Sequence, residues 1–300
     1  MRRRHAFTLI EMLVVIGIIG ILAALLLPTL SRGKRKAEGI SCVNNGHQLM
    51  TALTMYSSDY RDLFPPNPDD ANIVPGHNWC GGKAGQGGKE EFNPDIIADP
   101  TRSLLIHYVA NNVLVFRCPT DKRAGLYQGT NAALIGHTVP SARTFSMNQA
   151  CGTICEAFEI EWGQHGDKPY LPVNGPWLDN AHGNKRSGPW TTYGKFSNIS
   201  APGPAMLWVL MDEDATDLND AAFAFGMARP IWYDVPGTYH NFGCGFAFAD
   251  GHSETHQWKY RKQKVGWGTR VADDDDYADW FWMRARTSSH LDGNMPDPIR

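Results

Sequence analysis

The sequence predicts an α+β protein in which one long N-terminal helix packs on an antiparallel β-sheet head with large irregular loop insertions. Three observations lead to this prediction. The stretch from Phe7 to Leu27 is almost wholly apolar, and a stripe of apolar residues at helical spacing continues to Tyr60. The rest of the chain alternates short β-type runs with connections rich in Gly, Pro and Asn. A chain of 300 residues is long enough to bury a sizeable core.

The apolar stretch has the length of a membrane span, since roughly 20 apolar residues cross a bilayer as a helix. Arg2–Arg4 before it favour a cytoplasmic N-terminus, although the basic run Arg32–Lys36 after it weakens that bias. Glu11 is the exception inside the stretch, because a carboxylate in a spanning helix costs about 2.5–3.5 kcal/mol. A secretory signal peptide would end at an A-x-A site, which the segment after Pro28 lacks. A plain membrane anchor leaves Glu11 unexplained.

The stretch "AFTLIEMLVVIGIIGILAALLLP" resembles the N-terminus of type IV pilins and type II secretion pseudopilins. The resemblance implies a leader at residues 1–6, removed by a prepilin peptidase between Ala6 and Phe7, and methylation of the new N-terminal Phe7. It also makes Glu11 the acid in the fifth position after the cut. Members of the family usually have Gly before the cut, where this chain has Ala6.

Charge pairing explains the acid in the apolar helix. Cleavage before Phe7 creates a free α-amine, which a neighbouring copy can offer to Glu11 during assembly, and a paired charge is tolerable in hydrocarbon. Gly17, Gly20 and Pro28 lower the rigidity of this helix. We therefore expect the region 7–60 to be a membrane and assembly helix that polymerises with copies of itself on an inner-membrane assembly platform.

The head is expected at residues 61–300. The helix should continue with interruptions to about Tyr60, with an apolar stripe of Leu49, Leu53, Tyr56 and Tyr60, and end at Phe64-Pro65-Pro66. Residues 67–89 read as a long surface loop, and residues 150–205 as an irregular insertion. The predicted strands are Val113–Phe116, Thr144–Met147, Ala205–Met211 and Gly243–Ala249.

A second set of motifs resembles a large prepilin-like family with an H-x9-DG region, here at about residues 240–258. His240 is followed by nine residues and then by Asp250-Gly251. Two further landmarks of that family are matched by Cys42-Val43-Asn44-Asn45 and by Cys118-Pro119-Thr120-Asp121. The resemblance implies a type of subunit rather than an activity.

The six cysteines suit an exported head, because oxidising compartments favour disulfides, but six cysteines allow 15 pairings. A Cys42–Cys118 disulfide is favoured because both residues lie in the landmarks of the resembled family. Cys151–Cys155 is a plausible local disulfide, and zinc bound by these two cysteines with histidines is the alternative.

Asp250-Gly251 predicts a two-residue hairpin turn. Pairing outward from it sets Ala249 opposite His252, Ala247 opposite Glu254 and Gly245 opposite His256, with Phe248 opposite Ser253 and Phe246 opposite Thr255. The histidines and the glutamate would then share one face, as a polar exposed face or as a zinc site.

The sequence contains two acidic runs, for which we expect different roles. Asp212, Asp214, Asp217 and Asp220 alternate in a loop after a strand, which suits calcium, although the Gly and terminal Glu of an EF-hand are missing. Asp273–Asp276 is expected to be a solvated charge run. Removal of the leader arginines takes the formal charge from −3 to −6, so nucleic acid is not an expected partner.

The sequence has no G-x-S-x-G, H-E-x-x-H or comparable catalytic signature, so a structural role is expected. The prediction is a subunit of a type IV pilus-like or pseudopilus filament, held in the inner membrane with its N-terminus in the cytoplasm and later located at the cell surface or in the periplasm. A minor pseudopilin of a type II secretion machine is the first alternative. A membrane-anchored glycan-binding protein is the second, with rings that could stack on sugars at Trp79, Trp162, Trp177 and Trp190.

Overall fold

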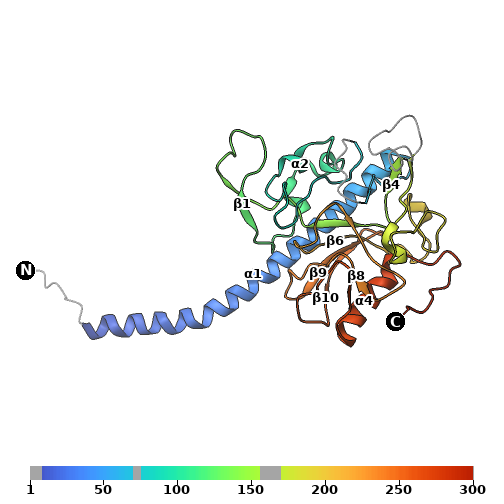
Figure 1. Ribbon diagram of the computed structural model, residues 1–300. Coiled ribbons are helices and arrows are strands. Elements are labelled where there is room, and N and C mark those ends of the chain that lie inside the picture. Colours follow the sequence, from blue (N-terminus) through green and yellow to red (C-terminus); the bar gives the residue numbers. More distant parts are fainter. Residues whose placement is uncertain (1–8, 70–75, 156–169, 300) are drawn as a thin grey trace, which may run out of the picture.

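The computed structural model describes residues 9–69, 76–155 and 170–299. Its first element, α1 (Leu9–Asp59), is one helix of 51 residues that extends far out of the head (Figure 1). The predicted end near Tyr60 is confirmed, and the predicted interruptions are wrong, since Pro28 lies inside the helix. Positive φ angles at Arg61 and Asp62 turn the chain away before it reaches Pro65.

The two halves of α1 differ in burial. The side chains described between residues 9 and 30 are exposed, whereas the second half packs on the head. Leu49, Leu53 and Tyr56 are buried, as their spacing predicts, while Tyr60, just beyond the helix, is 50% exposed. The apolar stripe therefore marks the contact between helix and head.

The central sheet has five strands in the order β10, β9, β6, β3, β7. In that order their bounds are Ser253–Gln257, Gly243–Phe248, Trp208–Asp212, Phe145–Asn148 and Ala222–Phe223. Neighbouring strands are antiparallel, except that β3 and β7 are parallel. The α+β prediction is confirmed. The predicted run that begins at Gly243 contains β9, and the runs that begin at Thr144 and Ala205 overlap β3 and β6, each of which ends one residue later than predicted.

The run Val113–Phe116 is a 3₁₀ helix, η2, and not a strand. The side chain of Asn112 accepts a hydrogen bond of 3.1 Å from the backbone of Leu114, which stabilises a tight turn at this point. A strand and a buried helical turn can both contain four consecutive apolar residues, so such a short run cannot distinguish them in the sequence.

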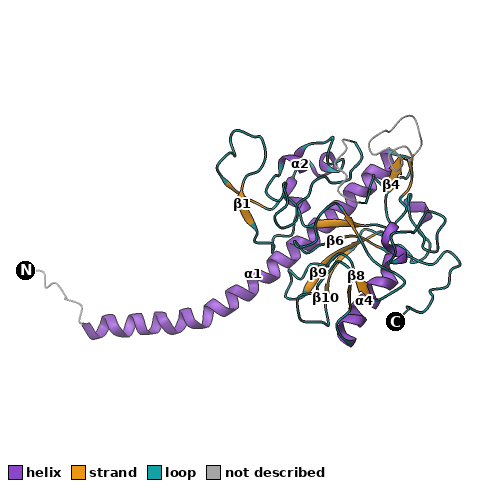
Figure 2. Cartoon of the chain, viewed as in Figure 1, coloured by secondary structure: helices purple, strands orange, loops and turns teal. Residues whose placement is uncertain are grey.

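Short elements and loops make up most of the remaining head (Figure 2). Three two-stranded pairs are β1 (Ala124–Leu126) with β2 (Thr138–Pro140), β4 (Thr153–Cys155) with β5 (Tyr170–Pro172), and β8 (Ile231–Trp232) with β11 (Thr269–Arg270). The short helices are α2 (Asp95–Ala98), η1 (Ile106–Val109), η3 (Pro176–Asp179) and η4 (Phe196–Asn198). The described part of the predicted surface loop 67–89 has no helix or strand. Its predicted place at the surface is wrong for much of its length, since Trp79 and Cys80 are buried in the core.

One face of the sheet is built for close approach of α1. Strand β9 presents Gly245 and Ala247 to the helix, and a Cβ placed on Gly46 of α1 would lie 3.3 Å from the Cβ of Ala247 and 3.2 Å from Oγ of Ser253. Such spacing leaves room for glycine and for little else. Small residues on both surfaces therefore bring the helix backbone against the strands.

The opposite face carries the aromatic side chains and is covered by α4 (Asp274–Thr287). Phe246 of β9 lies 5.0 Å from Trp282 between ring centroids, and the indole of Trp208 donates a hydrogen bond of 3.0 Å to Thr287. The sheet thus lies between α1 and α4.

The acidic run Asp273–Asp276 forms the N-cap and first residues of α4: Asp273, Asp274 and Asp275 are exposed, as predicted for a solvated run, whereas the prediction is wrong for the buried Asp276. Asp273 caps the helix by accepting a hydrogen bond of 3.0 Å from the backbone of Asp276. The Asp276 carboxylate is buried and lies 2.7 Å from the ammonium group of Lys264, which also contacts Asp279 at 2.9 Å. A buried lysine needs such partners.

The turn between β9 and β10 has three residues and not the predicted two. Phe248 donates a backbone hydrogen bond of 2.9 Å to His252, and Gly251 takes a φ of +95°, as a turn of this length requires. Ser253 therefore lies opposite Ala247 and Glu254 opposite Phe246. This one-residue shift moves the predicted polar face to the aromatic side of the hairpin.

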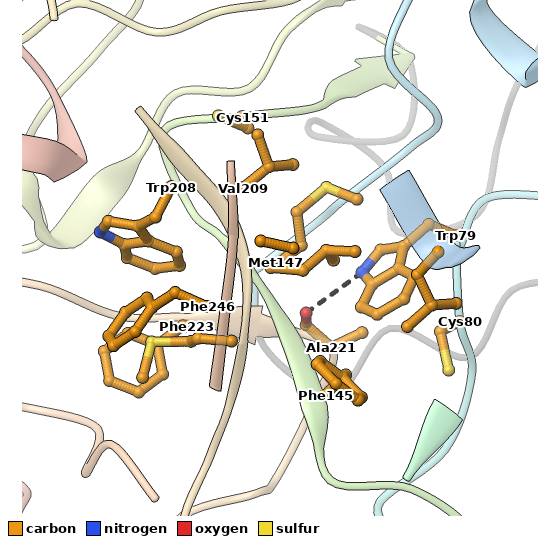
Figure 3. Close-up of a cluster of buried hydrophobic side chains, with 14 of the residues drawn as sticks. Trp79, Cys80, Phe145, Met147, Cys151, Trp208, Val209, Ala221, Phe223 and Phe246 are labelled. Carbon is orange, nitrogen blue, oxygen red and sulfur yellow. Dashed lines mark hydrogen bonds between the residues drawn. The ribbon is translucent and has the colours of Figure 1, made fainter. Parts of the chain in front are cut away.

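Tryptophans hold the loops on the sheet. The indole N–H of Trp79 donates hydrogen bonds of 3.1 Å to the Ala221 carbonyl, drawn in Figure 3, and to the side chain of Asn67. Trp79 and Trp190 are buried, so neither offers a ring to a ligand at the surface. Trp177 is partly buried and Trp162 lies outside the described residues.

The contact at Gly46 can be tested with Gly46→Leu. We expect the substitution to lower the free energy of unfolding of the head by about 1–3 kcal/mol, because the added side chain forces the helix from the sheet. The measurement is urea unfolding of the full chain in detergent micelles, followed by circular dichroism.

The matched control is Gly33→Leu in the same helix, where an added Cβ meets no atom within 4 Å. This variant should change stability by less than about 0.5 kcal/mol. Equal effects of the two variants would contradict the close packing of α1 on β9.

Candidate functional site

The exposed half of α1 is the first candidate functional region. It is long and apolar enough to cross a membrane, by length and composition, and none of its most apolar 18-residue window is buried. Glu11 lies in its first turn, and a Cβ on Gly17 or Gly20 would meet no atom within 4 Å. Ala6 and Phe7, the predicted cleavage site, lie outside the described residues.

The second candidate lies where α1 meets the head, and we name it the four-donor cluster. Its members come from four separate segments: Cys42, Cys118, Asp212 and His240. The two sulfur atoms, one carboxylate oxygen and one imidazole nitrogen all lie within 4.8 Å of one another. Within the described ranges this is the one group of three or more such donors that meets this distance.

Short contacts connect the donors. Cys42 donates a hydrogen bond of 2.9 Å from Sγ to Oδ2 of Asp212, and Nε2 of His240 lies 3.5 Å from the same oxygen. Nε2 also lies 3.4 Å from Sγ of Cys118. The side chain of His240 is 6% exposed and that of Asp212 is fully buried, so water has little access to these contacts.

Neighbouring side chains hold Asp212 and Cys118 in place. Thr144 donates a hydrogen bond of 2.8 Å to the second oxygen of Asp212 and accepts one of 2.7 Å from the backbone of Cys118. Asn45, one turn after Cys42 on α1, donates a hydrogen bond of 3.0 Å to the carbonyl of Arg117. The asparagine of one sequence landmark therefore positions the cysteine of the next.

The proximity of these groups changes their acidity. Burial raises the pKa of the Cys118 thiol, but its hydrogen bonds with Cys42 and His240 outweigh this effect, and the pKa falls to about 7. Burial lowers the pKa of His240, whereas the Asp212 carboxylate and the Cys118 sulfur raise it, to about 10 in total. Once the thiols and the ring of His240 release their protons, these thiolates, the carboxylate and the imidazole are ligands suited to a transition metal.

The predicted Cys42–Cys118 disulfide is not formed, since both cysteines are free thiols. Their sulfur atoms contact Asp212 and His240 instead of being joined to each other. Cys151 is also a free, buried thiol, and the side chain of Cys155 lies outside the described residues.

Known proteins resemble the N-terminal part of the chain. Residues 1–27 match the family described as the prokaryotic N-terminal methylation motif. The N-terminal segment therefore carries the methylation motif of prepilins.

Curated relatives agree with this motif. The chain is 47% identical over 58 residues to the type II secretion system core protein G of Aeromonas hydrophila, covering 19% of this chain and 41% of that protein. It is 44% identical over 59 residues to the Klebsiella pneumoniae protein of the same name, with 20% and 42% covered. The chain thus spans less than half the length of these relatives. No solved structure matches it significantly.

Within the described part of the chain, the four acids predicted to bind calcium do not form one ligand set. Asp212 points into the four-donor cluster, whereas Asp214 lies in a turn, where it accepts hydrogen bonds from Thr216. Asp220 accepts a hydrogen bond of 2.7 Å from the backbone of Ala222. Burial raises the pKa of Asp217 to about 6. Asp212 is separated from the later acids because β6 ends at this residue, whereas Asp214 and Asp217 share one turn.

The predicted zinc face on the β9–β10 hairpin is also not formed. His252 stacks on Phe248 and contacts Asp250 at 2.6 Å, and His256 stacks on Trp282 with ring centroids 3.7 Å apart. Asp250 and Gly251 of the H-x9-DG motif build the hairpin turn, while His240 of the same motif belongs to the four-donor cluster.

His256 gives a test of pH dependence. Burial is the main cause that lowers its pKa to about 4; nearby Arg286, Lys264 and Lys259 contribute to this shift, and Asp279 opposes it. An unfolded histidine titrates near 6.5, so the unfolded chain binds a proton between pH 6.5 and 4 that the folded chain does not. Stability should therefore fall as the pH is lowered through this window.

The variant His256→Gln should show a shallower fall of the urea unfolding free energy between pH 6.5 and 4 than the unchanged chain. His252→Gln, at the exposed start of the same hairpin arm, is the matched control and should keep the original slope. Equal slopes for all three chains would mean that His256 does not resist protonation.

Proposed function

We propose that the chain is a structural subunit of a pilus-like or pseudopilus filament, made as a membrane-inserted precursor and polymerised through α1. The observation that carries this proposal is the apolar half of α1, which projects from the head with its side chains exposed and one acid in its first turn. Such a surface needs lipid or other helices around it. A filament core provides the second of these.

The length of the apolar half of α1 suits a helix that first spans the membrane and then enters a filament. The stretch from Leu9 to Leu27 is roughly 29 Å long at 1.5 Å per residue, close to the roughly 30 Å of a bilayer core. The basic residues Lys34, Arg35 and Lys36 follow it on an exposed part of the helix, where they suit contact with lipid headgroups. The head then begins beyond the membrane surface.

Glu11 gives the assembled state its register. Removal of residues 1–6 would leave the α-amine of Phe7 about one helical turn from Glu11, and a pair between this amine and the Glu11 of the next copy would relieve the cost of an acid in lipid. The partners in this proposal are copies of the chain, a prepilin peptidase that also methylates Phe7, and an inner-membrane assembly platform.

The names of the relatives favour one type of filament over the alternatives. Proteins described as type II secretion system core protein G share the N-terminal similarity, so a pseudopilus in the periplasm is the first setting to test. A minor subunit of that structure and a surface pilus are the alternatives. In each case the N-terminus of the precursor lies in the cytoplasm and the head on the far side of the inner membrane.

The role of Glu11 can be tested with Glu11→Ala. Membrane insertion should be kept or improved, since the variant removes a cost of about 2.5–3.5 kcal/mol, whereas incorporation into filaments should fall at least tenfold. Insertion is measured by membrane fractionation and incorporation by immunoblotting of sheared filaments.

The control is Glu38→Ala on the same helix beyond the span, where the carboxylate lies 2.7 Å from Nζ of the exposed Lys122. This variant should assemble normally. Normal filaments from Glu11→Ala would refute the pairing of acid and amine.

The maturation step makes a second prediction. Mass spectrometry of assembled material should find chains that begin with N-methylated Phe7. The variant Ala6→Gly, which restores the residue usual in the resembled family, should be trimmed at least as fast as the unchanged precursor. Assembled chains that still carry Arg2–Arg4 would rule out this route of polymerisation.

A further inference from the structure

The four-donor cluster joins two parts of the molecule. Cys42 belongs to α1, while the other three donors belong to the head: Cys118 follows η2, Asp212 ends β6 and His240 precedes β9. A ligand held by all four would connect the helix directly to the head.

The chemistry of the donors narrows the ligand. Two sulfurs, one imidazole nitrogen and one carboxylate oxygen match the donors of tetrahedral zinc sites, and thiolates disfavour Ca²⁺ and Mg²⁺. Zn–S bonds near 2.3 Å and Zn–N or Zn–O bonds near 2.0 Å place tetrahedral ligand atoms roughly 3.3–3.8 Å apart. The distance from Nε2 of His240 is 3.4 Å to Cys118 Sγ and 3.5 Å to Asp212 Oδ2, both inside this range. The distance of 2.9 Å between Cys42 Sγ and Asp212 Oδ2 is shorter than the range, so these two atoms would move apart by about half an ångström around an ion.

We propose that the four-donor cluster binds one Zn²⁺ ion that fastens α1 to the head. The site is structural, because four protein ligands fill a tetrahedral ion and leave no open position for a substrate. The proposal goes beyond filament assembly and does not depend on it.

The surroundings support a metal rather than a bare pair of thiols. Thr144 holds the second carboxylate oxygen of Asp212 at 2.8 Å, the type of outer contact that orients a ligating carboxylate. A groove lined by Glu38, Gly39, Thr120, Lys122 and His240 opens beside α1, and it reaches the cluster from solvent at the histidine. An ion therefore has a path of entry.

A disulfide between Cys42 and Cys118 is the rival state for an exported protein. It would consume both thiolates and leave the buried Asp212 carboxylate facing His240 alone. A bound ion instead uses all four side chains, and it protects the sulfurs from oxidation because both are coordinated.

The test is metal analysis of the full chain, extracted in detergent and desalted. We expect about one Zn²⁺ per chain, as a single tetrahedral site requires. Cys118→Ser and His240→Asn should each reduce the zinc content at least fivefold. The matched controls Cys80→Ser, at another buried thiol, and His252→Asn, in the hairpin turn, should keep it.

A second measurement covers variants that fail to fold. After removal of metal with a chelator, addition of Co²⁺ to the unchanged chain should produce the visible absorption of a tetrahedral thiolate site, and Zn²⁺ should abolish it. Alkylation in denaturant without reductant should label both Cys42 and Cys118.

Three results would overturn the proposal: zinc below about one-tenth of an ion per chain, since a structural site binds its metal tightly; recovery of Cys42 and Cys118 as a disulfide-linked pair; or a different metal at full occupancy. If Glu11→Ala loses filaments but keeps its zinc, the zinc site does not depend on filament assembly, and the two proposals can be judged separately.

Discussion

The contact between the second half of α1 and strand β9 is the constraint on which the rest of the structure depends. Gly46 on the helix and Gly245 and Ala247 on the strand remove the side chains that would otherwise hold the two backbones apart. The helix can then lie directly on the sheet, and the aromatic residues of the same strand all face α4. Alternation along one strand thus separates a helix-binding face from a core-forming face.

The same helix has two environments because its sequence changes character at its middle. Before Pro28 it is apolar on every side, which suits lipid or a bundle of identical helices. From Cys42 onward only one stripe is apolar, and this stripe covers the sheet. Exposed basic residues separate the two parts. One continuous element can therefore serve as membrane span and as part of the head, and forces on the span reach the head without passing through a loop.

Sequence patterns predicted α1, β3, β6 and β9, because each is a long apolar or alternating run. The patterns failed where a single residue determines the local structure. The side chain of Asn112 stabilises a 3₁₀ helix in an apolar run that was predicted to be a strand. A third residue in the turn shifts the register of β9 and β10 by one. The four-donor cluster could not be predicted from the sequence for another reason. Three of its members lie in separate recognised motifs, and the fourth, Asp212, lies in a run of acids whose spacing suggested calcium. Only folding shows that these segments converge.

The position of the cluster along α1 explains why a strong bond there matters. Among the described side chains of α1, Cys42 is the first that is buried when the helix is followed from the membrane towards the head. A pull on the span would peel the helix from the sheet starting at this end, because contacts at the edge of an interface break before those behind them. Packing of small residues gives little resistance at an edge. A coordinate bond at Cys42 closes that edge, so separation would require many contacts to break together.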